Sequence, residues 1–230
     1  MVGAFMSLSE KNILVVGGSG VLGGELVRAL SARGARVLAT ASSNEGATRI
    51  PAQAALRLLV NLADPASIKV LTDYLNATES LDGIVLAAGR VGFGLAADTA
   101  ATSAADLMQL NFLGQAQLVT ELLPNLATRE TAFVAAITGI VAEKSFAGMA
   151  AYSASKSAMS SWLTGAGQEW RRQGIRVLDA RPGHTETGLA TRPLFGSAPQ
   201  MPTGMTPSHV AETIIRGLES GAAVLSSGDF

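Results

Sequence analysis

Cysteine is absent from the 230 residues of this chain, and histidine occurs only twice, at His184 and His209. Without cysteine, the protein can form no disulfide, use no thiolate nucleophile and bind no metal through sulfur. Two histidines are too few for a histidine-rich metal site. We therefore expect no metal centre, and the lack of cysteine fits a reducing compartment.

The chain also lacks an excess of charge of either sign. It has 17 Lys and Arg residues and 18 Asp and Glu residues, which gives a net charge of −1. Neither nucleic acid nor an anionic membrane is an expected partner. No stretch reaches the ~18 consecutive apolar residues of a membrane span, and residues 1–11 do not resemble a secretory signal. These absences predict a cytoplasmic protein.

Hydrophobic residues make up 48% of the chain, enough for a large core within a single domain over residues 1–230. Apolar runs of strand length alternate with longer segments of helical period, which is typical of strand–helix units around a parallel sheet. The expected strands are 12–16, 36–40, 56–60, 83–87, 132–137, 175–180 and 223–226. The expected helices are 20–32, 65–76, 102–127, 151–172 and 207–220.

This order of elements predicts an α/β fold. We expect a Rossmann-type, doubly wound parallel sheet of seven strands with helices on both faces. The segment 183–205 is rich in Pro and Gly and follows a strand. Because ligands bind beyond the carboxyl ends of parallel strands, this segment is expected to form a substrate lid.

Four glycines lie between the first expected strand and the first expected helix, at positions 17, 18, 20 and 23. Glycine lets the backbone turn tightly and approach a pyrophosphate, whose charge meets the N-terminus of the helix. The strand before the loop and the helix after it favour nucleotide binding over a tight turn without a ligand. The residues expected to bind the cofactor here are Gly17, Ser19, Gly20, Leu22 and Gly23.

The end of the second strand bears on which dinucleotide is bound. An NAD site commonly has an acidic residue here, which binds the ribose 2′-hydroxyl. This strand instead ends in Thr40-Ala-Ser-Ser43, and the first acid is Glu45. Ser42 and Ser43 offer hydroxyl groups to a 2′-phosphate, so we predict NADP, with NAD as the alternative. No Arg or Lys is obviously placed as a counter-charge, and plain surface serines are the competing interpretation.

Tyr152 and Lys156 are four residues apart in an expected helix and so lie on one face of it. An ammonium beside a phenol favours the phenolate and lowers the pKa of the tyrosine from its ordinary value of about 10. This pair therefore predicts an acid–base device, and with the glycine loop it predicts a proton donor together with a dinucleotide cradle.

With these motifs in order, the chain resembles the short-chain dehydrogenase/reductase family from about Lys11 to Leu225. The resemblance also covers Leu86-Ala-Ala-Gly89, Asn111, Ile137-Thr-Gly139 and Pro182-Gly-His-Thr-Glu-Thr187. It implies that Tyr152 gives a proton to the substrate oxygen, that Lys156 binds the nicotinamide ribose, and that Asn111 holds a water beside Lys156. The further cofactor contacts that it implies are Asn61, Leu62, Ala87, Ala88, Gly89, Pro182, Gly183, Thr185 and Thr187.

The chain departs from the family at the catalytic serine, where it has Gly139 preceded by Thr138. Glycine has no hydroxyl for the substrate oxygen, and the loss of one such donor typically costs about 10²–10³ in rate. We expect Thr138 to replace the serine if the loop rotates. Ser145 and Ser153 are weaker replacements, because one lies in the following loop and the other follows Tyr152 on the helix.

Apolar residues flank the expected site in sequence and predict an apolar or cyclic substrate, although packing of the lid on the core explains them equally well. These residues are Phe146, Met149, Leu189, Leu194, Phe195, Met201 and Met205. The expected helices 102–127 and 151–172 are too apolar to be covered on one face only, so we predict a homodimer or homotetramer.

Three functions follow from these features. The first is an NADPH-dependent reductase of a ketone or enone on a small metabolite. The second is a non-redox isomerase or dehydratase of the same scaffold, for which the missing serine would reflect different chemistry. The third is a dinucleotide-binding regulatory protein with vestigial catalytic residues, and the presence of Asn111, Tyr152 and Lys156 together argues against it.

Overall fold

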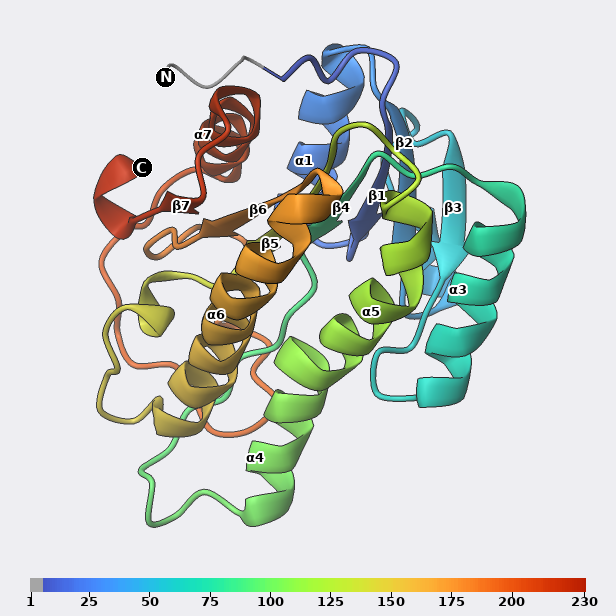
Figure 1. The fold of residues 1–230 in the computed structure, drawn as a ribbon. Helices are drawn as coiled ribbons and strands as arrows, with labels where there is room; N and C mark the ends of the chain where they lie inside the picture. Colours follow the sequence, from blue (N-terminus) through green and yellow to red (C-terminus); the bar gives the residue numbers. More distant parts are fainter. Residues whose placement is uncertain (1–5) are drawn as a thin grey trace.

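A parallel sheet of seven strands forms the centre of the computed structural model, which describes residues 6–230 (Figure 1). The order is β3-β2-β1-β4-β5-β6-β7, and every neighbouring pair is parallel. This confirms the predicted doubly wound sheet. The strands are β1 (Asn12–Val16), β2 (Arg36–Ala41), β3 (Leu56–Leu59), β4 (Gly83–Leu86), β5 (Ala132–Ile137), β6 (Ile175–Ala180) and β7 (Val224–Leu225).

Helices cover both faces of the sheet (Figure 1). On one face, α1 (Val21–Ala32) and α7 (Pro207–Ser220) pack together over side chains such as Ile13 and Val15 of β1. On the other, α3 (Pro65–Thr78), α5 (Gly114–Leu126) and α6 (Ala150–Trp170) cover Leu14 and Val16. Successive side chains of a strand point to opposite faces, so a strand that is apolar throughout contributes to the hydrophobic core on each face of the sheet.

The helix expected at 102–127 is interrupted. It consists of α4 (Ala101–Met108), a π-helical turn η1 (Gln109–Leu113) and α5. The wider turn leaves backbone acceptors that side-chain amides satisfy: Gln115 Nε2 donates to the carbonyls of Leu110 and Ala88, at 2.9 and 3.2 Å. π-Helical turns within α-helices are frequent at functional sites, and this one carries Asn111.

Two smaller elements also differ from the expected pattern. A short helix, α2 (Asn44–Thr48), follows β2, and the Ser43 side chain caps its N-terminus by accepting from Gly46 N at 3.0 Å. β7 has only two residues, because only Asp179 and Ala180 of β6 pair with it. The other strand and helix boundaries lie within two residues of those expected.

The expected ligand-binding position is at the carboxyl ends of β1 and β4, where the order of the strands reverses. The chain leaves β1 toward β2 on one side, and β4 lies on the other, which is the position where doubly wound sheets bind nucleotides. The loops after the two strands touch, since a Cβ atom added at Gly17 would lie 2.7 Å from Ala88 N. Only glycine permits this approach, all the more because Gly17 has φ +87°.

The segment 183–205, expected as a lid, contains neither a helix nor a strand. It is tied to the loop after β4 by hydrogen bonds from Leu194 N to Val91 O (2.7 Å) and from Phe93 N to Phe195 O (3.0 Å). The Phe195 ring lies so close to Gly92 that a Cβ atom there would be 2.4 Å from it. The segment therefore lies over the loops at the expected ligand-binding position.

The packing at the start of α5 can be tested with one methyl group. A Cβ atom at Gly114 would lie 2.1 Å from Leu62 O, whereas one at Gly165, on the exposed side of α6, would meet nothing within 4 Å. We expect Gly114→Ala to lower the free energy of unfolding by about 1–3 kcal/mol. The matched control Gly165→Ala should raise it, by up to about 1 kcal/mol. Urea denaturation measures both, and equal effects would contradict this account of the helix start.

Candidate active site

Tyr152 and Lys156 lie on the first turns of α6, beside the carboxyl end of β5. Tyr152 is half-buried, whereas Lys156 is only 6% exposed. The ammonium Nζ of Lys156 donates to the carbonyl of Ile137, the last residue of β5, at 2.7 Å. α6 and β5 thus meet at the proposed acid–base pair.

Burial shifts the pKa values of these two groups away from one another. It raises the pKa of Tyr152 to about 12, because the phenolate is disfavoured in an apolar surrounding. It lowers the pKa of Lys156 to about 8, and the charge of Asp179 opposes that shift. The sequence predicted that Lys156 lowers the pKa of Tyr152, whereas in the structure the pKa is raised, with burial as the cause.

Asn111 lies on the π-helical turn and is fully buried. Its Oδ1 accepts from Arg90 N, and its Nδ2 donates to Arg90 O and to Ser155 Oγ, each at 2.9 Å. Both amide hydrogens are therefore used. A Cβ atom added at Gly89 would lie 3.3 Å from both Asn111 Oδ1 and Lys156 Nζ, so the two groups flank Gly89. A water held between them stays a prediction.

The structure corrects the role expected for Thr138. Its side chain is completely buried, and its hydroxyl donates to Asp179 Oδ1, with Ala180 O 3.4 Å away. A threonine hydroxyl can donate one hydrogen bond, and here Asp179 accepts it. Thr138 therefore supplies no hydrogen bond to a substrate in this arrangement.

Gly139 also departs from the geometry of a serine. Its backbone has φ +80° and ψ 166°, a region that residues other than glycine rarely adopt. Space is not the constraint, because the nearest atom to an added Cβ is Pro182 O at 3.6 Å. The turn after β5 thus requires glycine for its backbone.

The two weaker replacements for the serine differ in exposure. Ser145 is exposed in the loop before α6. Ser153 is 1% exposed, and among residues 6–230 it is the one whose buried side-chain oxygen has no hydrogen-bond partner. A role for either hydroxyl at the substrate stays a prediction.

The glycine loop has the geometry of a phosphate cradle. Gly17 N donates to Thr40 Oγ1 at 3.0 Å, which ties the loop to β2, and a Cβ atom at Gly23 would lie 2.2 Å from Gly17 O. Gly20 and Val21 are exposed at the N-terminus of α1, where no side chain caps the helix. The free N–H groups of a helix start favour an anion, so these residues fit the pyrophosphate of a dinucleotide.

The remaining expected cofactor residues line the same edge of the sheet. Ala87, Ala88 and Gly89 follow β4, and Pro182 and Gly183 follow β6. Pro182 O accepts from Ile140 N at 2.9 Å, which joins the turns after β5 and β6. The other members are Ser19 and Leu22 in the glycine loop, Asn61 and Leu62 after β3, and Thr185 and Thr187 in the lid.

Ser42 and Ser43 are exposed after β2, as a 2′-phosphate contact requires. Arg49, which sequence reasoning did not place, lies beside them: a Cβ atom at Gly46 would be 3.3 Å from Ser43 Oγ and 3.6 Å from Arg49 Nη2. Its ion pair with Glu45 spans 3.3 Å on the surface, with side chains 56% and 89% exposed. Such a pair is weak, which leaves Arg49 free to bind another anion.

The segment 183–205, expected as a lid, carries an open pocket of about 620 Å³ lined by its own residues, among them His184, Glu186 and Met201. Its lining does not include Tyr152 or Lys156. His184 Nε2 lies 3.4 Å from Glu186 Oε1. Phe195 packs on Gly92, and Met205 packs against the core, so these two side chains hold the lid in place.

Within residues 6–230, no three His, Asp or Glu residues lie together in a way that could hold a metal ion. The same part of the chain contains no helix that is long and apolar enough to cross a membrane.

Comparison with known proteins places these features in a family. Residues 11–193 match the model of the short chain dehydrogenase family. The uncharacterized oxidoreductase YmfI of Bacillus subtilis is 29% identical over 186 residues, 78% of this chain and 77% of that protein. The 3-oxoacyl-[acyl-carrier-protein] reductase FabG of Salmonella typhimurium is 28% identical over 208 residues, 86% of this chain and 85% of its own.

A crystal structure of a short chain dehydrogenase from Burkholderia cenocepacia in complex with NADP has the same fold. Its TM-score is 0.84 at 20% identity, over 96% of this chain and 89% of that one. The chain therefore belongs to the short-chain dehydrogenase/reductase family, and it is an NAD(P)-dependent oxidoreductase.

The strained turn at Gly139 yields a stability prediction. Gly139→Ser would force a side chain into a backbone region that costs about 1–3 kcal/mol, so the free energy of unfolding in urea should fall by that amount. Gly183→Ala is the control, since its Cβ would meet only Met205 Cε at 3.7 Å. It should change stability by less than about 0.5 kcal/mol. A Gly139→Ser variant as stable as the parent would show that the turn relaxes.

Proposed function

We propose that the protein is an NADPH-dependent reductase of a ketone or enone on a small apolar or cyclic metabolite, with Tyr152 as the proton donor. One observation carries this proposal: the half-buried Tyr152 and the buried Lys156 lie at the same edge of the sheet as the glycine cradle. The reductase activity named for the Salmonella relative supports the direction of the reaction.

The state of Tyr152 suits an acid. Burial raises the pKa of its phenol to about 12, so the hydroxyl keeps its proton at neutral pH. A bound nicotinamide would supply hydride to the carbonyl carbon. The oxygen then becomes strongly basic, and Tyr152 donates its proton to it. With neither Thr138 nor a serine at position 139, we propose that Tyr152 also makes the main hydrogen bond that orients this oxygen.

Lys156 is proposed to bind the ribose of the nicotinamide. An ammonium has three hydrogens, and Ile137 O accepts one of them at 2.7 Å, so two are left for a diol. Since burial lowers the pKa of Lys156 to about 8, the ammonium is present below about pH 8 and is lost above it. We expect reduction to slow as the pH rises through this value.

NADP is proposed over NAD because the residues beyond β2 match a 2′-phosphate. Ser42, Ser43 and Arg49 offer two hydroxyls and a guanidinium at one place, and no acid stands at the end of the strand. A guanidinium pairs well with phosphate. The Burkholderia protein was crystallised with NADP, which supports the same choice for this chain.

The role of Tyr152 is tested against the other tyrosine of the chain, Tyr74, which is 43% exposed on α3. With a panel of cyclic and aliphatic ketones and enones, Tyr152→Phe should lower NADPH oxidation by about 10²–10⁴-fold. NADPH affinity should stay within about twofold, and Tyr74→Phe should have no effect on either. Undiminished turnover in Tyr152→Phe would assign the proton to another group. Loss of substrate without NADPH oxidation would favour the isomerase or dehydratase.

Cofactor choice is measured by fluorescence titration of NADPH and NADH. We expect NADPH to bind more tightly, and Arg49→Gln to weaken NADPH by about tenfold, the value of one charge-assisted hydrogen bond, while NADH is unaffected. Arg216→Gln, on the exposed side of α7, is the control.

Ser42→Asp should shift the preference toward NADH. Tighter binding of NADH by the parent protein would overturn the NADP assignment.

A further inference from the structure

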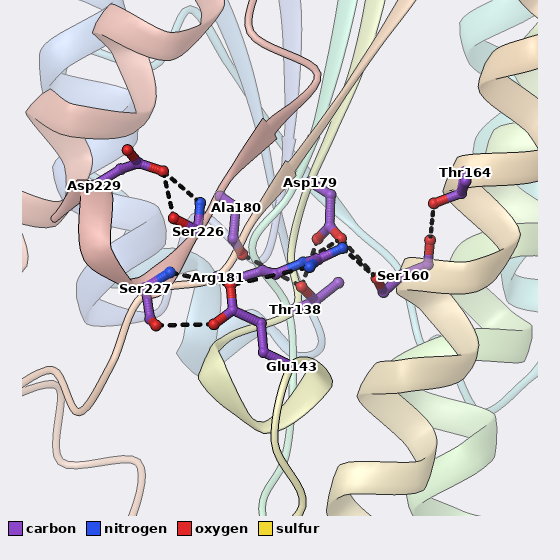
Figure 2. A network of polar contacts seen from close by, with 10 residues as sticks. All are labelled: Thr138, Glu143, Ser160, Thr164, Asp179, Ala180, Arg181, Ser226, Ser227 and Asp229. Carbon is purple, nitrogen blue, oxygen red and sulfur yellow. Dashed lines mark hydrogen bonds and ion pairs between the residues drawn. The ribbon is translucent and has the colours of Figure 1, made fainter.

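Asp179 is a buried acid that the proposed reaction does not use. It lies near the end of β6, is 2% exposed, and forms the centre of a polar network (Figure 2). Oδ1 accepts from the Thr138 hydroxyl, and Oδ2 accepts from Ser160 Oγ at 2.7 Å and from Arg181 Nε at 2.8 Å. All three donors come from different parts of the fold: the turn after β5, α6, and the residue after β6.

The network places Asp179 directly behind the catalytic turn. Thr138 N and Gly139 N both donate to the carbonyl of Ala180, at 2.9 and 3.2 Å, and Ala180 follows Asp179. The carbonyl that holds Lys156 belongs to Ile137, which precedes Thr138. The Asp179 side chain and the Ala180 carbonyl therefore bind the Thr138–Gly139 turn, and the residue before this turn accepts the hydrogen bond of Lys156.

Asp179 also joins this turn to the helix of the acid–base pair. Ser160, which donates to Oδ2, is four residues after Lys156 and so lies on the same face of α6. Arg181 Nη2 donates to the same Ser160 oxygen at 3.0 Å. One carboxylate thus fixes the turn and the helix on either side of Lys156.

A buried carboxylate is costly, and a buried ion pair does not by itself make a fold more stable than apolar residues of the same volume. The partner Arg181 is 22% exposed, and Glu143, whose oxygen lies 3.9 Å from Arg181 Nη1, is also 22% exposed. Asp179 is therefore the most buried charge of this network.

We propose that Asp179 is a positioning residue of the active site, which fixes the Thr138–Gly139 turn against α6 and provides a negative charge for the buried ammonium of Lys156. The proposal rests on the proposed role of Lys156 in cofactor binding. It also gives a role to the buried Thr138 hydroxyl, which donates to Asp179.

The electrostatics agree with this geometry. Burial lowers the pKa of Lys156, and the charge of Asp179 is what counteracts it. The other titratable groups on α6 and on or beside the elements that pack against it are not among the causes of this shift. They are Tyr152, Glu169, Arg171, Arg172, Arg176, Arg181, Glu143 and Asp106. Without Asp179, we expect Lys156 to lose its proton at a lower pH.

Lys156 can be titrated directly, because the chain contains only four lysines, at positions 11, 69, 144 and 156. Protein labelled with ¹³C at the lysine ε carbon, without cofactor or substrate, is titrated by NMR, and Lys156→Gln identifies the signal. We expect Asp179→Asn, which keeps the shape and removes the charge, to lower the midpoint of Lys156 by at least about half a pH unit.

A second variant predicts the opposite sign. Arg181→Gln removes the cation that neutralises Asp179 and leaves the carboxylate, so the midpoint of Lys156 should rise. Arg181 is partly exposed, so this variant carries the test if Asp179→Asn does not fold, which circular dichroism shows. The control Glu143→Gln, further along the network, should leave the midpoint unchanged.

An unchanged midpoint in folded Asp179→Asn, or shifts of the same sign in the Asp179 and Arg181 variants, would overturn the proposal. A purely structural network would alter stability without opposite shifts of one lysine. Because the titration uses neither NADPH nor a substrate, its outcome is independent of reductase activity. If no ketone is reduced but the two shifts are found, the reductase proposal fails, whereas the electrostatic link between Asp179 and Lys156 stands.

Discussion

The hydrogen bond between Lys156 Nζ and the Ile137 carbonyl is the interaction on which the active site depends. A buried ammonium needs partners that replace water, and here a backbone carbonyl at the end of β5 provides one at 2.7 Å. This contact sets α6 against the sheet and brings Tyr152 to the edge where β1 and β4 end. The glycine loop, the π-helical turn and the turns after β5 and β6 all meet at that edge.

Close backbone approaches make this edge a binding site. Gly17 touches Ala88, Gly89 lies between Asn111 and Lys156, and Gly114 seats the start of α5 against Leu62. At each place a methyl group would collide with the backbone or crowd the side chains of Asn111 and Lys156. The start of α1 lies at the carboxyl end of β1, the edge of the sheet where this fold binds a dinucleotide.

The turn after β5 is held as a unit. Gly139 has a backbone conformation that a serine does not readily adopt, and the buried Thr138 hydroxyl donates to Asp179. In the proposed reaction, Tyr152 and Lys156 act beside this turn, and Asp179 lies within the network that holds it.

The sequence by itself determined the sheet and its strands, and it predicted the edge at which a cofactor would bind. Apolar runs of strand length and the glycine cluster are local signals, and a parallel sheet requires little else. Tyr152 and Lys156 could be paired from their spacing alone, because four residues make one turn of a helix.

Only the tertiary structure decided the π-helical turn at Asn111, the inward rotation of Thr138 and the position of Arg49 beside Ser43. Each depends on a partner distant in sequence or on a packing environment: Leu62 and Ala88 for the turn, and Asp179, 41 residues along the chain, for Thr138. The raised pKa of Tyr152 also depends on the fold, since burial of the phenol is its cause and that burial requires packing by distant segments. Local sequence shows which groups are present, whereas long-range packing decides which partner each of them binds.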